Sequence, residues 1–179
     1  MDPNKYPDIP PRRKSFKRLI NQIVMFVAGR ALQSLSRSEP LVQHEVQTWP
    51  EGFTLMMGVY PHGGSLALTT LPGGKLSYLG SKYDPAKADV VINFKNVEAA
   101  FKMFTGQMGV DTGYAQHCMT ARGDLSNTVS VVRALNITVS YLFPAFLSAR
   151  LMKRLPPVPF WRKHRLRLKT YLLGVPFGI

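Results

Sequence analysis

The sequence predicts an α+β fold, and three observations lead to that prediction. Apolar residues recur at helical spacing from residue 16 to residue 35. Three alternating segments between residues 53 and 79 are separated by turns rich in glycine and proline, which is typical of a β meander. Beyond residue 90, two further strand-like segments are each followed by a helix-like one. The 179 residues suit one domain with extensions and are enough for a hydrophobic core.

The first predicted helix begins at Ser15, a residue type that caps helices, and ends near Leu35. Two interpretations of this helix stay open. It packs on the domain, or it lies among lipid headgroups, which requires the same amphipathic pattern with basic flanks. Its apolar stripe consists of Phe16, Leu19, Ile20, Ile23, Val27, Ala31 and Leu35.

The predicted sheet has five short strands, and turns such as "PHGG" and "PGGK" separate the first three. The strands are expected at residues 53–60, 65–71, 76–79, 90–94 and 117–122. The turn "PHGGS" is similar to the backbone oxyanion loop of lipases, but the sequence contains no nucleophile elbow, G-x-S-x-G. A hairpin turn that needs positive φ explains the paired glycines better.

Two apolar helices follow the fourth and fifth strands. The first occupies about residues 96–105, within the stretch "ADVVINFKNVEAAFKMFTGQMG", and a glycine-rich link follows it. The second is capped by Asp124 or Ser126 and runs to about Phe143, where Pro144 ends or kinks it. A short helix to Arg154 is expected after that.

The longer of these helices is apolar over more than one stripe. Its main stripe is Val132, Leu135, Val139, Leu142 and Phe146, whereas Arg133, Asn136 and Ser140 are expected on the opposite side. Val129, Val131 and Ile137 lie off the main stripe, so the helix needs apolar neighbours on two sides. A sheet covers one side, and a further helix, a lipid or a membrane covers the other.

Residue types that carry catalysis or bind metals are sparse. No two of the four histidines have metal-ligand spacing, so we predict no metal, no cofactor and no catalytic residue. Cys118 is the single cysteine, and the absence of an internal disulfide favours a reducing compartment. No secretory signal or membrane-spanning segment is recognised, which predicts a cytoplasmic protein attached only to the surface of a membrane.

The net charge of +13 is concentrated at the two ends of the chain. Residues 1–37 carry +6, residues 38–149 carry −1 and residues 150–179 carry +8. We therefore divide the chain into a basic leader with an amphipathic helix (1–37), a central domain (38–154) and a basic aromatic extension (155–179). Basic ends on a nearly neutral body indicate an anionic partner, either a membrane or a nucleic acid.

The order of short motifs resembles the sterol carrier protein type 2 family. Ala88-Asp89-Val90 opens a strand, Thr105-Gly106 follows a helix, and Arg122-Gly123-Asp124 leads into the last long helix. The resemblance covers about residues 45–150, and bacterial members that assist ubiquinone biosynthesis are similar in size and in having a basic helix before the domain. The C-terminal extension departs from the family pattern.

The resemblance implies a twisted, mostly antiparallel five-stranded sheet, covered by helices that enclose an apolar tunnel. It implies a lipid carrier without catalysis, whose ligand is a fatty acyl chain, a sterol-like molecule or an isoprenoid quinone precursor. The partners expected are this lipid, an anionic membrane surface and lipid-modifying enzymes, with no nucleic acid. A basic nucleic-acid-binding protein is the alternative, and a small hydrolase is less favoured because no nucleophile–base pair is recognised.

Two sets of residues are predicted to carry this function. Large apolar side chains of the fourth strand and the two helices are expected to line the lipid cavity: Phe94, Phe101, Phe104, Met108, Leu135, Val139 and Leu142. Basic and aromatic residues of the extension are expected to dock on the membrane: Trp161, Arg162, Lys163, Arg165, Arg167 and Lys169.

Overall fold

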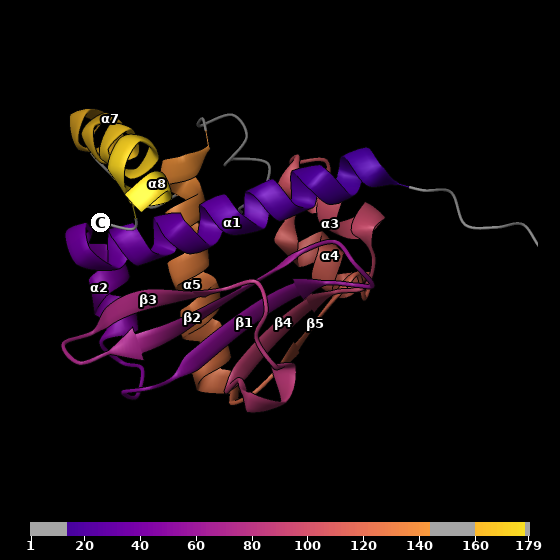
Figure 1. Ribbon diagram of the computed structural model, residues 1–179, viewed down its shortest axis with the longest axis horizontal. Helices are drawn as coiled ribbons and strands as arrows, with labels where there is room; N and C mark the ends of the chain where they lie inside the picture. The colour runs from indigo at the N-terminus through magenta and orange to yellow at the C-terminus, as the bar shows by residue number, and fades with distance from the viewer. Residues whose placement is uncertain (1–13, 144–159, 178–179) are drawn as a thin grey trace, which may run out of the picture.

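The computed structural model describes residues 14–143 and 160–177 and has an α+β fold, as predicted. Helix α1 runs across the width of the molecule on one side of a twisted sheet (Figure 1). Helix α5 runs at a steep angle to α1 (Figure 1). The helices are α1 (Ser15–Ser38), α2 (Pro40–Val46), η2 (Pro85–Lys87), α3 (Val97–Phe104), α4 (Val110–Ala115), α5 (Leu125–Leu142), α7 (Phe160–Lys169), η3 (Thr170–Gly174) and α8 (Val175–Phe177). The strands are β1 (Thr54–Val59), β2 (Ser65–Leu71), β3 (Lys75–Gly80), β4 (Val90–Phe94) and β5 (Met119–Arg122).

The five-stranded, mostly antiparallel sheet is confirmed. Its strand order is β3-β2-β1-β4-β5, and only the central pair β1–β4 is parallel. The meander β1–β2–β3 forms one half of the sheet, and β4 joins the free edge of β1 after the chain has passed through η2. Residues 55, 57 and 59 of β1 and 92 and 94 of β4 turn their side chains to the helical side, where they enter the core.

Two of the three motifs that carry the family resemblance have structural roles at one corner of the sheet. The Asp89 carboxylate accepts a hydrogen bond from the Thr54 backbone N–H at 2.7 Å, which fixes the start of β1. Gly123 has φ +134, and a Cβ there would lie 2.4 Å from the Asp89 carbonyl oxygen, so a side chain does not fit. Asp124 then caps α5 by accepting from the Asn127 N–H.

The hydrophobic core lies between the sheet and the helical layer. Buried residues from α1, such as Leu32 and Leu35, meet the apolar face of β1, β2 and β4. Helix α2 contacts α5 through polar bonds, because the Trp49 indole N–H that follows α2 donates to Ser130 Oγ at 2.8 Å and Glu45 pairs with Arg133. Because Leu32 and Leu35 are buried in this core, helix α1 packs on the domain, which was the first of the two interpretations left open by the sequence.

Three elements differ from the sequence prediction. Helix α2, which Glu39 caps, was not anticipated. The link expected from residue 106 to residue 113 contains helix α4, whose Gly113 packs on Met103 so closely that a Cβ would lie 2.8 Å from its sulfur. The extension contains α7, η3 and α8, which pack against α1 and α5. The helix expected up to Arg154 and the residue Phe146 lie outside the described residues.

Candidate functional site

A partly enclosed apolar cavity of about 290 Å³ lies between the sheet and the helices. Its floor comes from Met57 of β1 and from Ile92 and Phe94 of β4, and its walls come from α1, α3 and α5. Its full lining is Ile23, Val24, Met25, Val27, Ala28, Met57, Ile92, Phe94, Met103, Phe104, Val110, Met119, Val132, Leu135, Asn136, Val139, Leu142, Phe143 and Tyr171. Such a surface binds by apolar burial, at roughly 25 cal/mol per Å².

Five of the seven predicted cavity residues line this cavity: Phe94, Phe104, Leu135, Val139 and Leu142. The rings of Phe94 and Phe104 meet edge to face, with centroids 5.1 Å apart. The other two do not line it. Phe101 lies under the ammonium group of Lys17, which is 5.1 Å from its ring centroid, and Met108 packs at the margin of the core. Phe101 is on the face of α3 that turns away from the cavity, and Met108 lies in the link between α3 and α4.

Helix α1 supplies the part of the cavity wall that the sequence did not assign to it. Ile23 and Val27 belong to the recognised stripe, whereas Val24, Met25 and Ala28 do not. The apolar stripe of α1 could be recognised in the sequence. That α1 lies opposite α5 across the cavity depends on tertiary packing, which the sequence pattern does not contain. Asn136 was also misplaced: it was expected on the polar side of α5, and the structure puts it among the cavity-lining residues.

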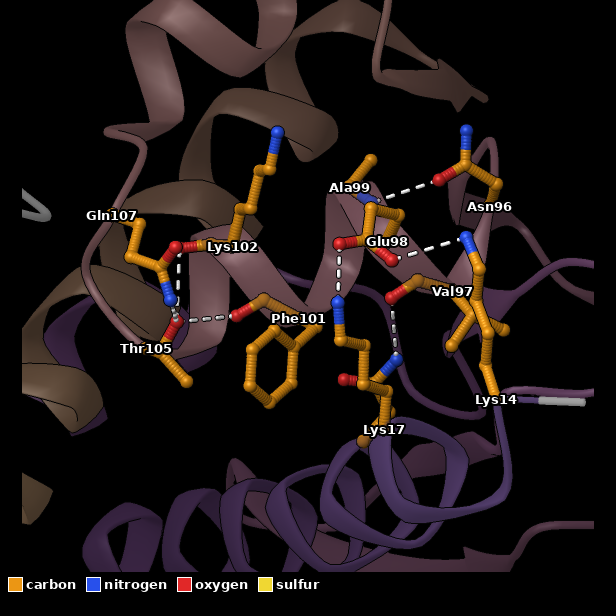
Figure 2. Close-up of polar contacts among 11 residues, drawn as sticks. Lys14, Lys17, Asn96, Val97, Glu98, Ala99, Phe101, Lys102, Thr105 and Gln107 are labelled. Carbon is orange, nitrogen blue, oxygen red and sulfur yellow. Dashed lines mark hydrogen bonds and ion pairs between the residues drawn. The ribbon is translucent and has the colours of Figure 1, made fainter. Parts of the chain in front are cut away.

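A polar junction holds α1 against α3 beside the cavity (Figure 2). Glu98 of α3 binds both Lys14, at 3.0 Å, and Lys17. Hydrogen bonds from Lys17 and then Lys14 lower the pKa of Glu98 to about 2. Deeper in the same junction, the buried Asn21 amide donates to the Val97 carbonyl at 3.0 Å. These bonds fix the spacing of two helices that border the cavity.

The C-terminal segment contributes one residue, Tyr171, to the cavity wall. The Tyr171 hydroxyl donates to the Leu142 carbonyl at 2.8 Å, and its ring lines the cavity. Arg167 donates to the Tyr141 carbonyl at 2.8 Å and to that of Phe143, so it binds carbonyls at the C-terminal end of α5. Burial raises the pKa of Tyr171, and the Arg167 charge opposes the rise.

The predicted docking residues of this segment are placed differently from one another. Trp161 is 78% exposed, and Arg165 and Lys169 are also exposed. Arg167 is half-buried in its contacts with α5. The side chains of Arg162 and Lys163 lie outside the described part of the structure. Exposed apolar residues accompany the exposed basic ones: Leu168, Leu172, Leu173 and Phe177.

The turn "PHGGS" forms one side of a more polar, more open depression of about 630 Å³ that also includes Asn93. Gly64 has φ +101, which agrees with a turn that requires glycine. A Cβ at Gly64 would lie 2.8 Å from the Gln22 side chain, so close approach to α1 is a second reason for this glycine. Across residues 14–143 and 160–177, no three His, Cys, Asp or Glu residues are placed to hold a metal ion.

The fold and the cavity together define a class of protein: a small α+β domain with an apolar cavity beneath its helices. Within the described part of the chain, none of the helices has the length and apolarity needed to cross a bilayer. No family model matches the sequence, and no curated protein matches it.

Solved structures similar to this chain include members of the family that the motifs resemble. A UbiJ-SCP2 ubiquinone synthesis protein is 17% identical, with 69% of this chain and 98% of that chain covered and a TM-score of 0.43. The sterol carrier protein domain 2 of Helicoverpa armigera is 12% identical, with 84% and 100% covered and a TM-score of 0.40. Sterol carrier protein 2 like 2 of Aedes aegypti is 15% identical, with 55% and 93% covered and a TM-score of 0.30. At these values the fold assignment rests on the sheet topology and the helical cover described above.

Proposed function

We propose that this protein binds a hydrophobic lipid in the cavity between its sheet and helices and presents that lipid at a membrane surface. The observation that carries the proposal is the cavity itself, which is lined almost entirely by apolar side chains, most of them from α1, α3, α5 and the sheet. The flexible side chains of Met25, Met57, Met103 and Met119 in its lining suit apolar ligands of variable shape. In this proposal Phe94, Phe104, Leu135, Val139 and Leu142 contact the lipid.

A large side chain placed inside the cavity tests lipid binding. Leu135→Trp and Phe104→Trp are expected to leave the protein folded while abolishing binding of a fluorescent fatty-acid probe. The extra volume costs about 1–3 kcal/mol of stability through overpacking. Phe101→Trp is the matched control, because Phe101 lies on α3 outside the cavity and its variant is expected to bind the probe normally. Unchanged probe affinity in folded Leu135→Trp and Phe104→Trp proteins would contradict the proposal.

The second part of the proposal is that the C-terminal segment docks on an anionic membrane. Exposed Trp161, Arg165 and Lys169 are combined there with exposed leucines, and Tyr171 of the same segment lines the cavity. Aromatic residues favour the headgroup level, and each basic residue near an anionic leaflet contributes about 1 kcal/mol. Docking through this segment would bring one end of the cavity to the bilayer, on its cytoplasmic side, without a membrane-spanning helix.

Charge reversal separates docking from lipid binding. Arg165→Glu combined with Lys169→Glu is expected to weaken binding to anionic liposomes at least tenfold at moderate salt, since two attractive charges of about 1 kcal/mol each are lost. Neutral liposomes should show a smaller change, and probe uptake from detergent should persist. Lys82→Glu with Lys87→Glu alters the net charge equally on exposed residues before β4 and is the control. Equal weakening by both pairs would contradict docking through this segment.

The resemblance seen in the sequence extends the proposal to an accessory role in lipid or ubiquinone biosynthesis, in which the protein hands its ligand to lipid-modifying enzymes. We assign no catalytic step to it. Extraction of the purified protein and identification of the lipids tests this extension. A bound isoprenoid quinone precursor supports it, and bound RNA would instead favour the nucleic-acid alternative.

A further inference from the structure

Asn136 is a polar residue in the middle of the apolar wall that α5 contributes to the cavity. Val132 and Val139, one turn before it and one turn after it, both line the cavity, and so does Phe143 two turns along. Residues at this spacing share one face of a helix, so the amide belongs to the same face as its apolar neighbours. Position alone therefore gives the Asn136 side chain no packing role that leucine would not fill better.

The Asn136 amide makes no hydrogen bond to any of the described residues, although it offers two N–H donors and a carbonyl acceptor. Other polar side chains of α5 are satisfied: Thr138 donates to the Ala134 carbonyl and Ser140 to the Ile137 carbonyl. The other side-chain hydroxyl of the lining, that of Tyr171, already donates to Leu142. The Asn136 side chain is only half-buried, so its amide is open to a polar partner that enters the cavity, such as a hydroxyl or carbonyl group of a ligand.

From this arrangement we infer that Asn136 binds a neutral hydroxyl or carbonyl group of the ligand and thereby sets its orientation. The inference rests on the proposed lipid-binding function. None of the described lining residues is charged, so nothing in the lining compensates a carboxylate, a phosphate or an ammonium group. An amide, by contrast, donates to and accepts from an uncharged phenol, alcohol or ketone. The group that meets Asn136 is therefore uncharged, whereas a charged group of a ligand, such as the carboxylate of a fatty acid, stays outside the cavity in water.

The size of the cavity limits the part of the ligand that enters with this group. About 290 Å³ is at the lower limit of the roughly 300–1,000 Å³ that is typical of ligand pockets, and the cavity is only partly enclosed. A single ring or a short chain occupies such a space, and the rest of a longer ligand extends out of the cavity. The ligand class is thus a neutral amphiphile that inserts a hydroxylated or carbonyl-bearing ring or a short chain.

Three matched compounds test the inference: para-pentylphenol, pentylbenzene and para-pentylbenzoate. Each is offered to the full chain, and affinity is measured by displacement of a fluorescent apolar dye at neutral pH. The wild-type protein is expected to bind the phenol about fivefold more tightly than pentylbenzene, the worth of one net hydrogen bond. The benzoate is expected to bind most weakly. Asn136→Leu should remove the preference for the phenol while it keeps or improves the affinity for pentylbenzene.

Asn127→Leu, on the same helix and outside the cavity, is the matched control and should keep the wild-type preference. The ligand-free Asn136→Leu protein should also have a higher Tm than wild type, because leucine has the higher helix propensity and fits an apolar wall better than an amide does. Three results would overturn the inference. They are an equal preference for the phenol in the wild-type and Asn136→Leu proteins, strongest binding of the benzoate, and a lowered Tm of Asn136→Leu. Failure of all three compounds to bind the wild-type protein would instead overturn the proposed lipid-binding function.

Discussion

The two halves of helix α1 belong to the same continuous helix and have opposite surroundings. In the second half, residues 31–36 are all buried, and Leu32 and Leu35 are 0% exposed. In the first half, Phe16 is 71% and Ile23 is 52% exposed, and the helix is held to α3 by Lys14, Lys17 and Glu98. The second half is therefore core, whereas the first half buries only Asn21 and Met25, borders the cavity and is held by polar bonds as well. A single amphipathic stripe in the sequence contains both roles.

The largest expected effect comes from truncating the buried half. Leu32→Ala should lower the free energy of unfolding by about 2–5 kcal/mol, because a fully buried leucine leaves a cavity in the core. Ile23→Ala, the same kind of truncation nine residues earlier, should cost no more than about 1 kcal/mol because half of its surface already meets solvent. Urea unfolding measures both. Similar losses in the two variants would break the distinction between the halves.

Gly29 lies where the two halves meet, and its replacement should have an intermediate effect. A Cβ at this position would lie 2.7 Å from the Tyr78 ring, which Phe26 and Arg30 also contact. Gly29→Ala gains about 1 kcal/mol of helix propensity but overpacks this contact at a cost of about 1–3 kcal/mol. We expect a net destabilisation of roughly 1 kcal/mol in thermal or urea unfolding.

A double-mutant cycle sharpens the prediction for Gly29. In a Tyr78→Ala background the ring is absent, so Gly29→Ala should become stabilising through helix propensity alone. If Gly29→Ala has the same sign in both backgrounds, the Tyr78 ring is not what requires glycine at this position.

The smallest expected effect concerns the polar border of the first half. The pKa of Glu98 is lowered to about 2 from its ordinary value of 4.5, so its ion pairs stabilise the folded state above pH 4.5. That contribution is lost as the pH falls from 4.5 through about 2, because the unfolded state then takes up the proton first. Glu98→Gln should be less stable than wild type at pH 7, and the difference should shrink toward pH 2 in urea unfolding. A difference that is constant with pH would exclude these ion pairs as its cause.

Local patterns predicted the elements of this fold well, and tertiary relations less well. Strand limits followed from glycine-rich turns, and Asp124 marked the start of α5. Helix α4 was missed because Gly109 and Gly113 read as a link, whereas Gly113 is present for its close contact with Met103. The parallel pairing of β1 with β4 is a relation between residues far apart in the sequence, and it was not predicted.

The same limit applies to the candidate site. Phe94, Phe104 and Leu135 were identified because large apolar residues crowd a short helix and a long one. Phe101 has the same residue type and helix but points toward Lys17, which is a matter of helix rotation. Asn136 was expected on the side of α5 opposite the apolar stripe, so a polar residue in a cavity wall is hidden from composition and periodicity alike.

The strand order has a consequence for synthesis of the chain. Strands β1, β2 and β3 are consecutive and pair locally, whereas β4 begins at Val90, more than thirty residues after β1 begins at Thr54. Until β4 leaves the ribosome, one edge of β1 presents unpaired backbone groups beside the apolar sequence TLMMGV, a template for pairing with another chain. The parallel β1–β4 ladder closes this edge late, because it joins strands that are far apart in the sequence. Such non-local pairing is slower than the formation of a local meander. Aggregation of nascent or refolding protein should therefore depend on how quickly residues 90–94 arrive, and β1 is the segment through which it would begin.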